Sequence, residues 1–125
     1  MKRLAQIRGD FKSALRRLDE ALKDAKTDLE VDGAIQRFEF TFELIWKLLR
    51  LFLEDQGIIC RTPKACLKEA YRIGVIDDEV TWLNILDDRN MSVHIYDKET
   101  SRKIFKRVKT KYIKEFKKVF EKVGK

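Results

Sequence analysis

Residues that break regular structure are scarce in this 125-residue chain, which holds a single proline and five glycines. Folds made of strands and tight turns use more of both residues, so a sheet-rich fold is not expected. The hydrophobic share is 44% and the charged share is 39%, which favours helices with one apolar and one charged face. We therefore predict an all-α fold with a single domain over residues 1–125.

Long apolar runs are also missing. No stretch reaches the roughly 20 residues that cross a bilayer, and the basic start over residues 1–8 lacks the apolar core of a signal peptide. The sequence contains no metal-ligand spacing and no Gly-rich phosphate loop. We expect a soluble, cytoplasmic protein with no membrane contact, no metal and no cofactor of its own.

Cysteine is limited to Cys60 and Cys66, which stand six residues apart without a second pair. This spacing fits neither a zinc site nor a disulfide framework. We expect two reduced thiols, with Cys66 packed in the core.

Positive charge is concentrated at the end of the chain. Residues 98–125 hold 12 Lys and Arg against 3 Glu, whereas residues 1–97 hold 16 against 18 acidic residues. Such a cluster can bind an RNA backbone, and the candidates near its start are Lys98, Arg102, Lys103 and Lys106. A solvated helix face near a helix C-terminus accounts for the same charges, and both interpretations stay open.

Apolar residues recur at steps of three or four through most of the chain, which predicts five helices. The first covers about residues 3–26. The second begins at a capping box formed by Thr27 and Glu30, or at Asp32, and ends near Gly57.

Three shorter helices follow, and short connections between all five predict an up-and-down bundle. Their starts are marked by the N-cap candidates Thr62 before Pro63, Asp77 or Asp78, and Asp97. The third helix is expected to stop at Gly74, and the fourth runs through Val80, Leu83 and Leu86 towards His94.

The second helix carries more large apolar residues than one face can hold. Off its main stripe lie Phe40, Leu44, Trp46, Leu48, Leu51 and Leu53. A helix that is apolar on more than one side is buried in its own domain or against a partner. From this surplus we infer a homodimer.

The most informative segment contains the only histidine, His94, preceded by Arg89 and Asn90. Histidine has a pKa of about 6.5 and can act as an acid or a base near neutral pH. Phosphodiester cleavage requires both a base and an acid, together with a cation for the charge on phosphorus. One histidine per chain cannot readily hold both proton roles, but a two-fold dimer would supply two copies.

A purely structural interpretation of this segment is also open. Arg89 can pair with Asp87, Asp88 or another carboxylate at a helix end, while His94 makes a structural hydrogen bond. Asp87 and Asp88 also add negative charge close to where a phosphate would lie. Asn90 and His94 share a helix face, whereas Arg89 and His94 point about 140° apart if the helix is unbroken.

Three segments together carry a family resemblance: residues 36–47 (QRFEFTFELIWK), Thr62-Pro63-Lys64, and Arg89-Asn90 with His94-Ile95-Tyr96. The resemblance covers nearly the whole chain, because it includes the order of the five helices. The chain resembles HEPN domains of the group known as nucleotidyltransferase substrate-binding proteins. This group is related to the HepT toxins that are encoded beside a minimal nucleotidyltransferase.

The resemblance implies a homodimeric bundle in which paired Arg-x4-His motifs form a cleft similar to a metal-independent ribonuclease site. Arg89 would stabilise the phosphorane, Asn90 would orient the site and His94 would move protons, with RNA as the substrate. Met91 and Ser92 are interpreted as spacers.

The resemblance also implies control by a cognate minimal nucleotidyltransferase, which would transfer AMP from ATP to Tyr96. ATP is then expected only on that partner. A packed aromatic ring with a satisfied hydroxyl is the alternative interpretation of Tyr96.

Two functions follow from the resemblance. The first is a ribonuclease toxin subunit of a toxin–antitoxin pair. The second is a non-catalytic substrate-binding subunit of a minimal nucleotidyltransferase complex. A dimeric structural protein without a nucleotide partner is a third hypothesis.

Overall fold

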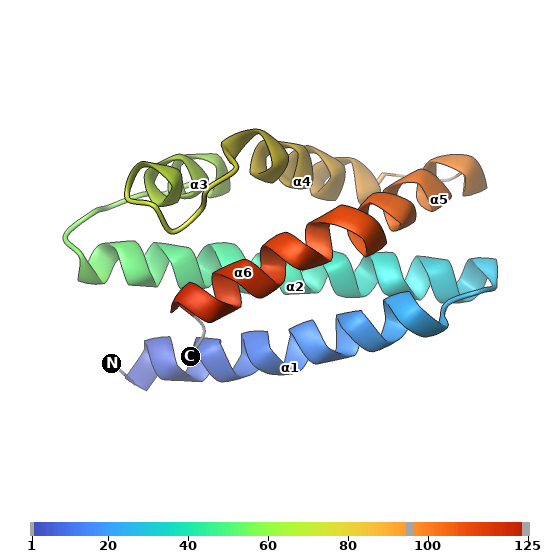
Figure 1. Ribbon diagram of the computed structural model, residues 1–125, viewed down its shortest axis with the longest axis horizontal. Coiled ribbons are helices and arrows are strands. Elements are labelled where there is room, and N and C mark those ends of the chain that lie inside the picture. The colour runs from blue at the N-terminus through green and yellow to red at the C-terminus, as the bar shows by residue number, and fades with distance from the viewer. Residues whose placement is uncertain (1, 95–96, 124–125) are drawn as a thin grey trace.

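The computed structural model describes residues 2–94 and 97–123, and within these ranges all regular structure is helical (Figure 1). The elements are α1 (Lys2–Asp24), α2 (Asp28–Asp55), α3 (Pro63–Arg72), α4 (Glu79–Ser92), α5 (Lys98–Arg107), the π turn η1 (Val108–Tyr112) and α6 (Ile113–Val123). The last three follow one another without a break and form one helix. The predicted all-α fold of five helices is therefore confirmed.

α1, α2, α4 and the last helix run alternately in opposite directions along the long axis of the molecule, and the short α3 lies between α2 and α4 at one end (Figure 1). The α1 and α2 helices pack against each other, α3 and α4 follow one another along one edge, and the α5–α6 helix packs on both α1 and α2. α2 contacts all of the other α-helices, so it is the central element of the predicted up-and-down bundle.

Helix starts follow the predicted capping residues. Thr27 begins α2 with a complete capping box, in which the Glu30 backbone N–H donates to Thr27 and the Glu30 carboxylate accepts from the Thr27 N–H. Asp32, the other candidate, lies inside α2. Gly57 follows the end of α2 with a φ of 81°, a left-handed conformation that glycine adopts without strain.

The later helices are capped in the same way. Thr62 begins α3 ahead of Pro63, Asp78 rather than Asp77 begins α4, and Asp97 begins α5. In each case the side chain of the cap accepts a hydrogen bond from the backbone N–H three residues later, which satisfies one of the free donors of the first turn.

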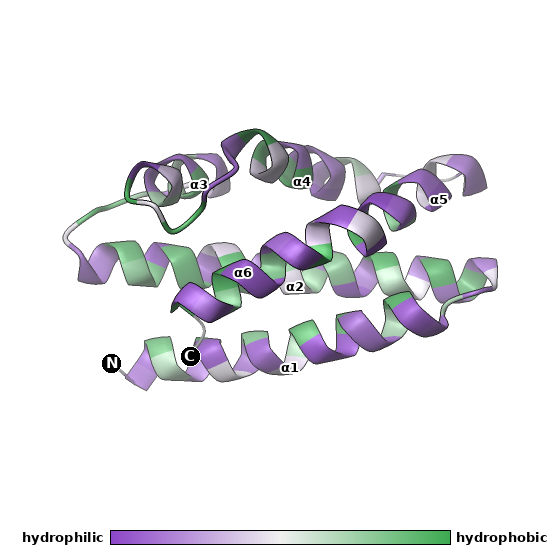
Figure 2. Cartoon of the chain, in the orientation of Figure 1, coloured by the Kyte–Doolittle hydropathy of each residue, from purple (hydrophilic) through white to green (hydrophobic). Residues whose placement is uncertain are grey.

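An aromatic cluster occupies the centre of the bundle. The Phe38 ring stacks on Tyr112 at 6.0 Å and on Phe116 at 5.9 Å, and Trp82 meets Phe116 at 5.7 Å. These rings come from α2, α4 and the last helix. Figure 2 shows the apolar faces of the helices turned towards one another, as the helical period predicts.

The apolar surplus of α2 is largely covered within the chain itself. Leu48, Leu51 and Leu53 are buried, whereas Phe40 remains 59% exposed. The homodimer inferred from the full surplus therefore has less apolar surface on α2 to support it than the sequence suggested. The reason is that α3 and the last helix cover two further sides of α2.

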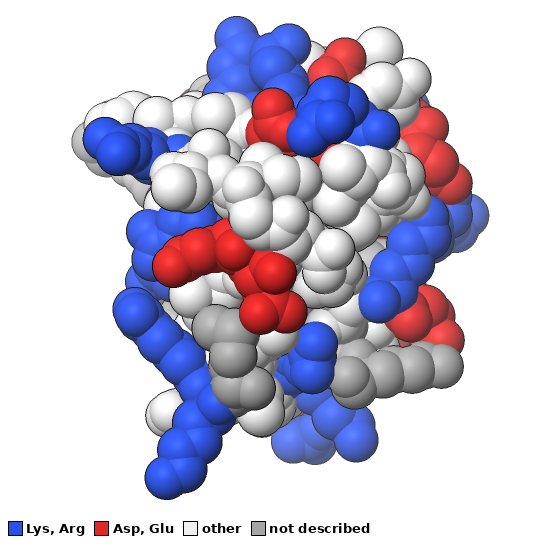
Figure 3. Space-filling model, turned by 90° about the vertical axis from the view of Figure 1, so that its left-hand side faces the viewer, with Lys and Arg blue, Asp and Glu red and all other residues white. Residues whose placement is uncertain are grey.

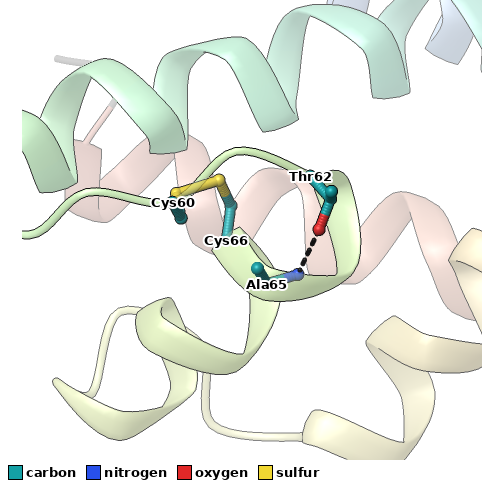
Figure 4. Close-up of a disulfide and its surroundings, with 4 residues drawn as sticks. All are labelled: Cys60, Thr62, Ala65 and Cys66. Atoms are coloured by element: carbon teal, nitrogen blue, oxygen red, sulfur yellow. Dashed lines mark hydrogen bonds between the residues drawn. A yellow bond between two sulfur atoms is a disulfide. The ribbon is translucent and has the colours of Figure 1, made fainter.

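The expectation of two reduced thiols is wrong in this structure, because Cys60 and Cys66 form a disulfide (Figure 4). The Thr62 hydroxyl accepts a hydrogen bond from the Ala65 N–H at 3.2 Å. This cap starts α3 between the two cysteines, and the first turn of α3 brings Cys66 close to Cys60. The two Cα atoms then lie 5.2 Å apart. Both cysteines pack against Leu53 in a small cluster beside the main core, so Cys66 is buried as predicted.

Apart from the buried Asp88 and Glu115, charged residues of the described chain lie at or near the surface of the bundle. Figure 3 views the end of the molecule that is on the left of Figure 1, and there basic and acidic side chains alternate around an uncharged centre. Among the described helices, none is long and apolar enough to cross a membrane.

Candidate functional site

The last turn of α4 carries the first two residues of the motif. Trp82 and Ile85 anchor α4 in the core, and this packing directs Arg89 towards α2. The Arg89 Nη2 donates to Glu43 Oε2 at 2.9 Å, and Nη1 donates to Asn90 Oδ1 at 3.1 Å. The sequence alone leaves open which carboxylate pairs with Arg89. The structure selects Glu43, which lies on α2.

The Arg89 side chain is 30% exposed and is held on several sides. Its guanidinium carbon lies 5.9 Å from the centre of the Phe42 ring, within the range of a cation–π contact. Its Nε is buried and has no hydrogen-bond acceptor among the described residues. The arrangement presents a cation whose position is fixed by α2.

A second carboxylate of α2 meets the end of α4. The Ser92 hydroxyl lies against the Glu39 carboxylate and also 2.9 Å from the Arg89 carbonyl oxygen. Ser92 is therefore a contact residue and not a mere spacer. Glu39 and Glu43 stand four apart on one face of α2, and acidic residues within the largely apolar segment 36–47 were the available signal for both.

His94 lies beyond the end of α4 and is exposed. The helix ends at Ser92, so the directions expected from an unbroken helix do not apply to His94. The His94 backbone N–H donates to the Met91 carbonyl at 3.0 Å, which continues the turn. Tyr96, the predicted modification site, lies outside the described residues.

Two exposed apolar side chains precede this histidine in the chain. Met91 is 49% exposed and Val93 is 56% exposed. Val80, which the sequence placed on the stripe of the same helix, is also exposed, because α4 buries the face that contains Trp82 and Ile85.

Asp88 does not pair with Arg89. It is buried, and its Oδ2 accepts from Arg107 Nε at 2.7 Å and from the Tyr112 hydroxyl at 2.5 Å, while Oδ1 accepts from Arg107 Nη2 at 2.9 Å. Burial, and then the hydrogen bond to Asp88, raise the pKa of Tyr112. The expected repulsion of phosphate by Asp88 is therefore wrong, because its charge is compensated inside the fold. Asp87 is exposed.

Three of the four candidates for RNA-backbone contacts are engaged in ion pairs. Lys98 and Arg102 both pair with Asp28, at 3.3 and 2.8 Å, and Lys103 pairs with Glu99 at 3.4 Å. The pKa of Asp28 is lowered, and the largest cause is its hydrogen bond with Arg102. Lys106 is exposed. Exposed pairs of this kind are weak, so these cations can exchange a carboxylate for a phosphate.

A surface hollow of about 570 Å³ lies between α2 and the start of α5, next to the end of α4. Its lining includes Ile35, Glu39, Ser92, Val93 and Arg102. Groups of three or more His, Cys, Asp or Glu that could hold a metal are not found in the part of the chain that the structure describes.

A bundle of five helices, with an arginine and an asparagine in the last turn of α4 and a histidine just past it, defines a HEPN-like protein. Residues 7–125 match the family described as "Nucleotidyltransferase substrate binding protein like". The chain belongs to this family.

Solved structures of similar proteins support the fold. A Thermus thermophilus protein of known crystal structure has a TM-score of 0.84 and 32% identity, with 90% of this chain and 98% of that chain covered. A Haemophilus influenzae protein, described as showing the fold of a substrate-binding domain of a nucleotidyltransferase, has a TM-score of 0.81 and 25% identity. That match covers 94% of this chain and 99% of the other.

A curated Haemophilus influenzae protein named Probable ribonuclease HepT is 34% identical over 86 residues. The match covers 65% of this chain and 59% of that relative. The chain thus spans about three-fifths of the curated relative that it matches.

Proposed function

We propose that this chain is the HEPN subunit of a two-component toxin–antitoxin system and acts as a metal-independent ribonuclease. The observation that carries the proposal is the placement of a guanidinium, held by Glu43, on Arg89 in the last turn of α4 and of an exposed histidine, His94, just past that turn. The similarity to a relative named as a ribonuclease supports the same activity.

The proposed chemistry is transfer of a phosphoryl group within the RNA chain. One His94 removes the proton of a ribose 2′-hydroxyl, whose oxygen attacks phosphorus. The bond to the 5′-oxygen breaks, and that oxygen receives a proton from a second histidine. Arg89 stabilises the additional negative charge on the phosphorane, while Asn90 orients Arg89 through its 3.1 Å contact. The products are a 2′,3′-cyclic phosphate and a free 5′-hydroxyl.

The second histidine is supplied by a homodimer. Each chain contains one histidine, so a cleft with both a base and an acid needs His94 of the partner subunit. The exposed apolar side chains of Met91 and Val93 beside the motif fit an interface at this place.

Control by a nucleotidyltransferase is the second part of the proposal. The family membership and the description of the Haemophilus influenzae structure support such a partner. The Tyr96 hydroxyl would attack the α-phosphorus of ATP held by the partner, pyrophosphate would leave, and AMP would remain on the phenol oxygen. An anionic group close to His94 would block the approach of an RNA phosphate.

A non-catalytic substrate-binding subunit of a minimal nucleotidyltransferase complex is the alternative. The 2.9 Å ion pair between Arg89 and Glu43 favours it, because this pair already compensates the charge that a phosphate would require.

The test is cleavage of a labelled mixed RNA in excess EDTA by wild type, His94→Ala and Tyr96→Phe, with Tyr71→Phe as a control at an exposed tyrosine. We expect cleavage by wild type and both tyrosine variants, with 2′,3′-cyclic ends, and none by His94→Ala. Absence of cleavage from protein shown by mass to carry no AMP would support the binding-subunit alternative.

A further inference from the structure

A cluster of polar side chains around the buried Asp88 lies next to the motif in sequence but is not used by the proposed chemistry. Tyr112 in this cluster is buried, whereas the Arg107 side chain is 42% exposed. Asp88 on α4 accepts three hydrogen bonds, two from Arg107 and one from Tyr112. Its side chain is 9% exposed. The cluster joins the end of α4 to the last helix of the bundle.

The π turn makes this cluster possible. Arg107 and Tyr112 are five residues apart, and in a regular α-helix their side chains would point about 140° away from each other. In η1 the Ile113 N–H donates to the Val108 carbonyl, five residues back, so the turn contains one extra residue. That extra residue brings Arg107 and Tyr112 onto one face, as in an ordinary pair four apart.

Asp88 and Arg89 are neighbours on α4, so their side chains leave the helix in different directions. Asp88 binds the last helix, whereas Arg89 binds Glu43 on α2. Two charged contacts to two different helices therefore act together with the core packing of Trp82 and Ile85 to hold the rotation of α4 about its axis. A rotation of the last turn would move the Arg89 guanidinium.

We propose that Asp88, held by Arg107 and Tyr112, is a positioning residue that sets the place of Arg89 for the reaction. This inference rests on the proposed ribonuclease function and adds to it a role for the π turn.

Stability alone is a poor explanation for this cluster. The Arg107 side chain is 42% exposed, so water screens its attraction to Asp88, and the cost of removing the Asp88 carboxylate from water offsets much of the gain. What the cluster supplies, and apolar packing does not, is a directional contact. The bidentate geometry of Arg107 on Asp88 restricts the relative placement of the two helices.

The test compares Asp88→Asn and Tyr112→Phe with two matched controls. Asp87→Asn makes the same change at the exposed neighbouring position, and Tyr71→Phe removes an exposed phenol hydroxyl. In RNA cleavage we expect kcat to fall about 100-fold in the two cluster variants, with KM within about twofold, because the displaced cation acts on the transition state. The controls should retain the wild-type kcat. Equal kcat in all folded variants would overturn the inference.

A second measurement separates this inference from the proposed function. The Arg89 Nε–H resonance, assigned with Arg89→Lys, reports the surroundings of a buried nitrogen without any RNA. We expect it to shift in Asp88→Asn and Tyr112→Phe and to keep its position in both controls.

If wild type does not cleave RNA, the proposed function fails and this resonance alone decides the inference. An unchanged signal in the cluster variants would overturn it. Should Asp88→Asn not fold, Tyr112→Phe still carries the test, because it keeps the ring that stacks on Phe38.

Discussion

Arg89 on α4 and Glu43 on α2 form an ion pair of 2.9 Å between residues 46 positions apart in sequence. Both side chains are about one-third exposed, so the pair is partly screened by water. It holds the guanidinium in place and at the same time competes with an incoming phosphate.

Replacing Glu43 by Gln should release this competition. The variant keeps a similar size and loses one negative charge beside Arg89, so we expect the Kd for RNA to fall about fivefold, in line with about 1 kcal/mol for one partly exposed charge. Fluorescence anisotropy with His94→Ala as the common background, to prevent cleavage, measures the affinity. Glu54→Gln at an exposed position of α2 is the matched control. Unchanged affinity in Glu43→Gln alone would show that Glu43 does not compete.

The proposed homodimer places exposed apolar residues of the motif segment at its interface. Met91→Glu should convert the dimer to a monomer, because a charge would be buried without a partner. Sedimentation at micromolar protein should give twice the chain mass of 14.9 kDa for wild type and a single chain for Met91→Glu. Ile59→Glu, on the loop before α3, changes an exposed apolar residue at another part of the molecule and should leave the dimer intact. A monomeric wild type would refute the interface.

The buried phenol of Tyr112 should make the fold sensitive to alkali. Burial and Asp88 raise the pKa of Tyr112 above its ordinary value of 10.0. Below that value both folded and unfolded chains hold the proton. Above it the unfolded chain loses the proton first, so the free energy of unfolding decreases as the pH rises towards the folded-state pKa.

Urea denaturation at a series of pH values between about 9 and 11 measures this decrease. Tyr112→Phe should show a shallower decrease than wild type, since it has no proton to lose at this position. The exposed-site variant Tyr71→Phe should retain the wild-type slope. Equal slopes for wild type and Tyr112→Phe would contradict the prediction.

The disulfide between Cys60 and Cys66 should contribute measurably to stability. Closing a short loop removes conformational freedom from the unfolded chain, which for this spacing amounts to about 2 kcal/mol. Urea denaturation with and without a phosphine reductant should show this difference for wild type. The double variant Cys60→Ala/Cys66→Ala should be insensitive to the reductant. Identical wild-type midpoints in both conditions would show that the bond adds nothing.

Local signals in the sequence predicted most of the fold. Thr27, Thr62 and Asp97 were recognised as caps because each contacts residues within one turn of itself. The fourth helix was expected to run towards His94, and α4 ends two residues before it, at Ser92. The π turn was not predicted, because its stripe of apolar residues resembles that of an ordinary helix.

The candidate site was predicted only in part. Arg89, Asn90 and His94 came from the motif, and their roles stay predictions. The contacts of Glu39 and Glu43 with the motif were not foreseen, because they depend on how α2 packs against α4. The pairing of Cys60 with Cys66 was missed as well, since a single pair of cysteines carries no framework signal.

The sequence by itself determined the helices, the candidates for their caps and most of the apolar residues that they bury, because these depend on neighbours three or four residues away. Only the tertiary structure decided which carboxylate holds Arg89, and that Asp88 turns away from it to bind Arg107 and Tyr112. Such choices are made among charges that are distant in the chain. The packing of α2, α4 and the last helix brings Glu43 within reach of Arg89, buries Asp88 against Arg107 and Tyr112, and leaves Asp87 exposed.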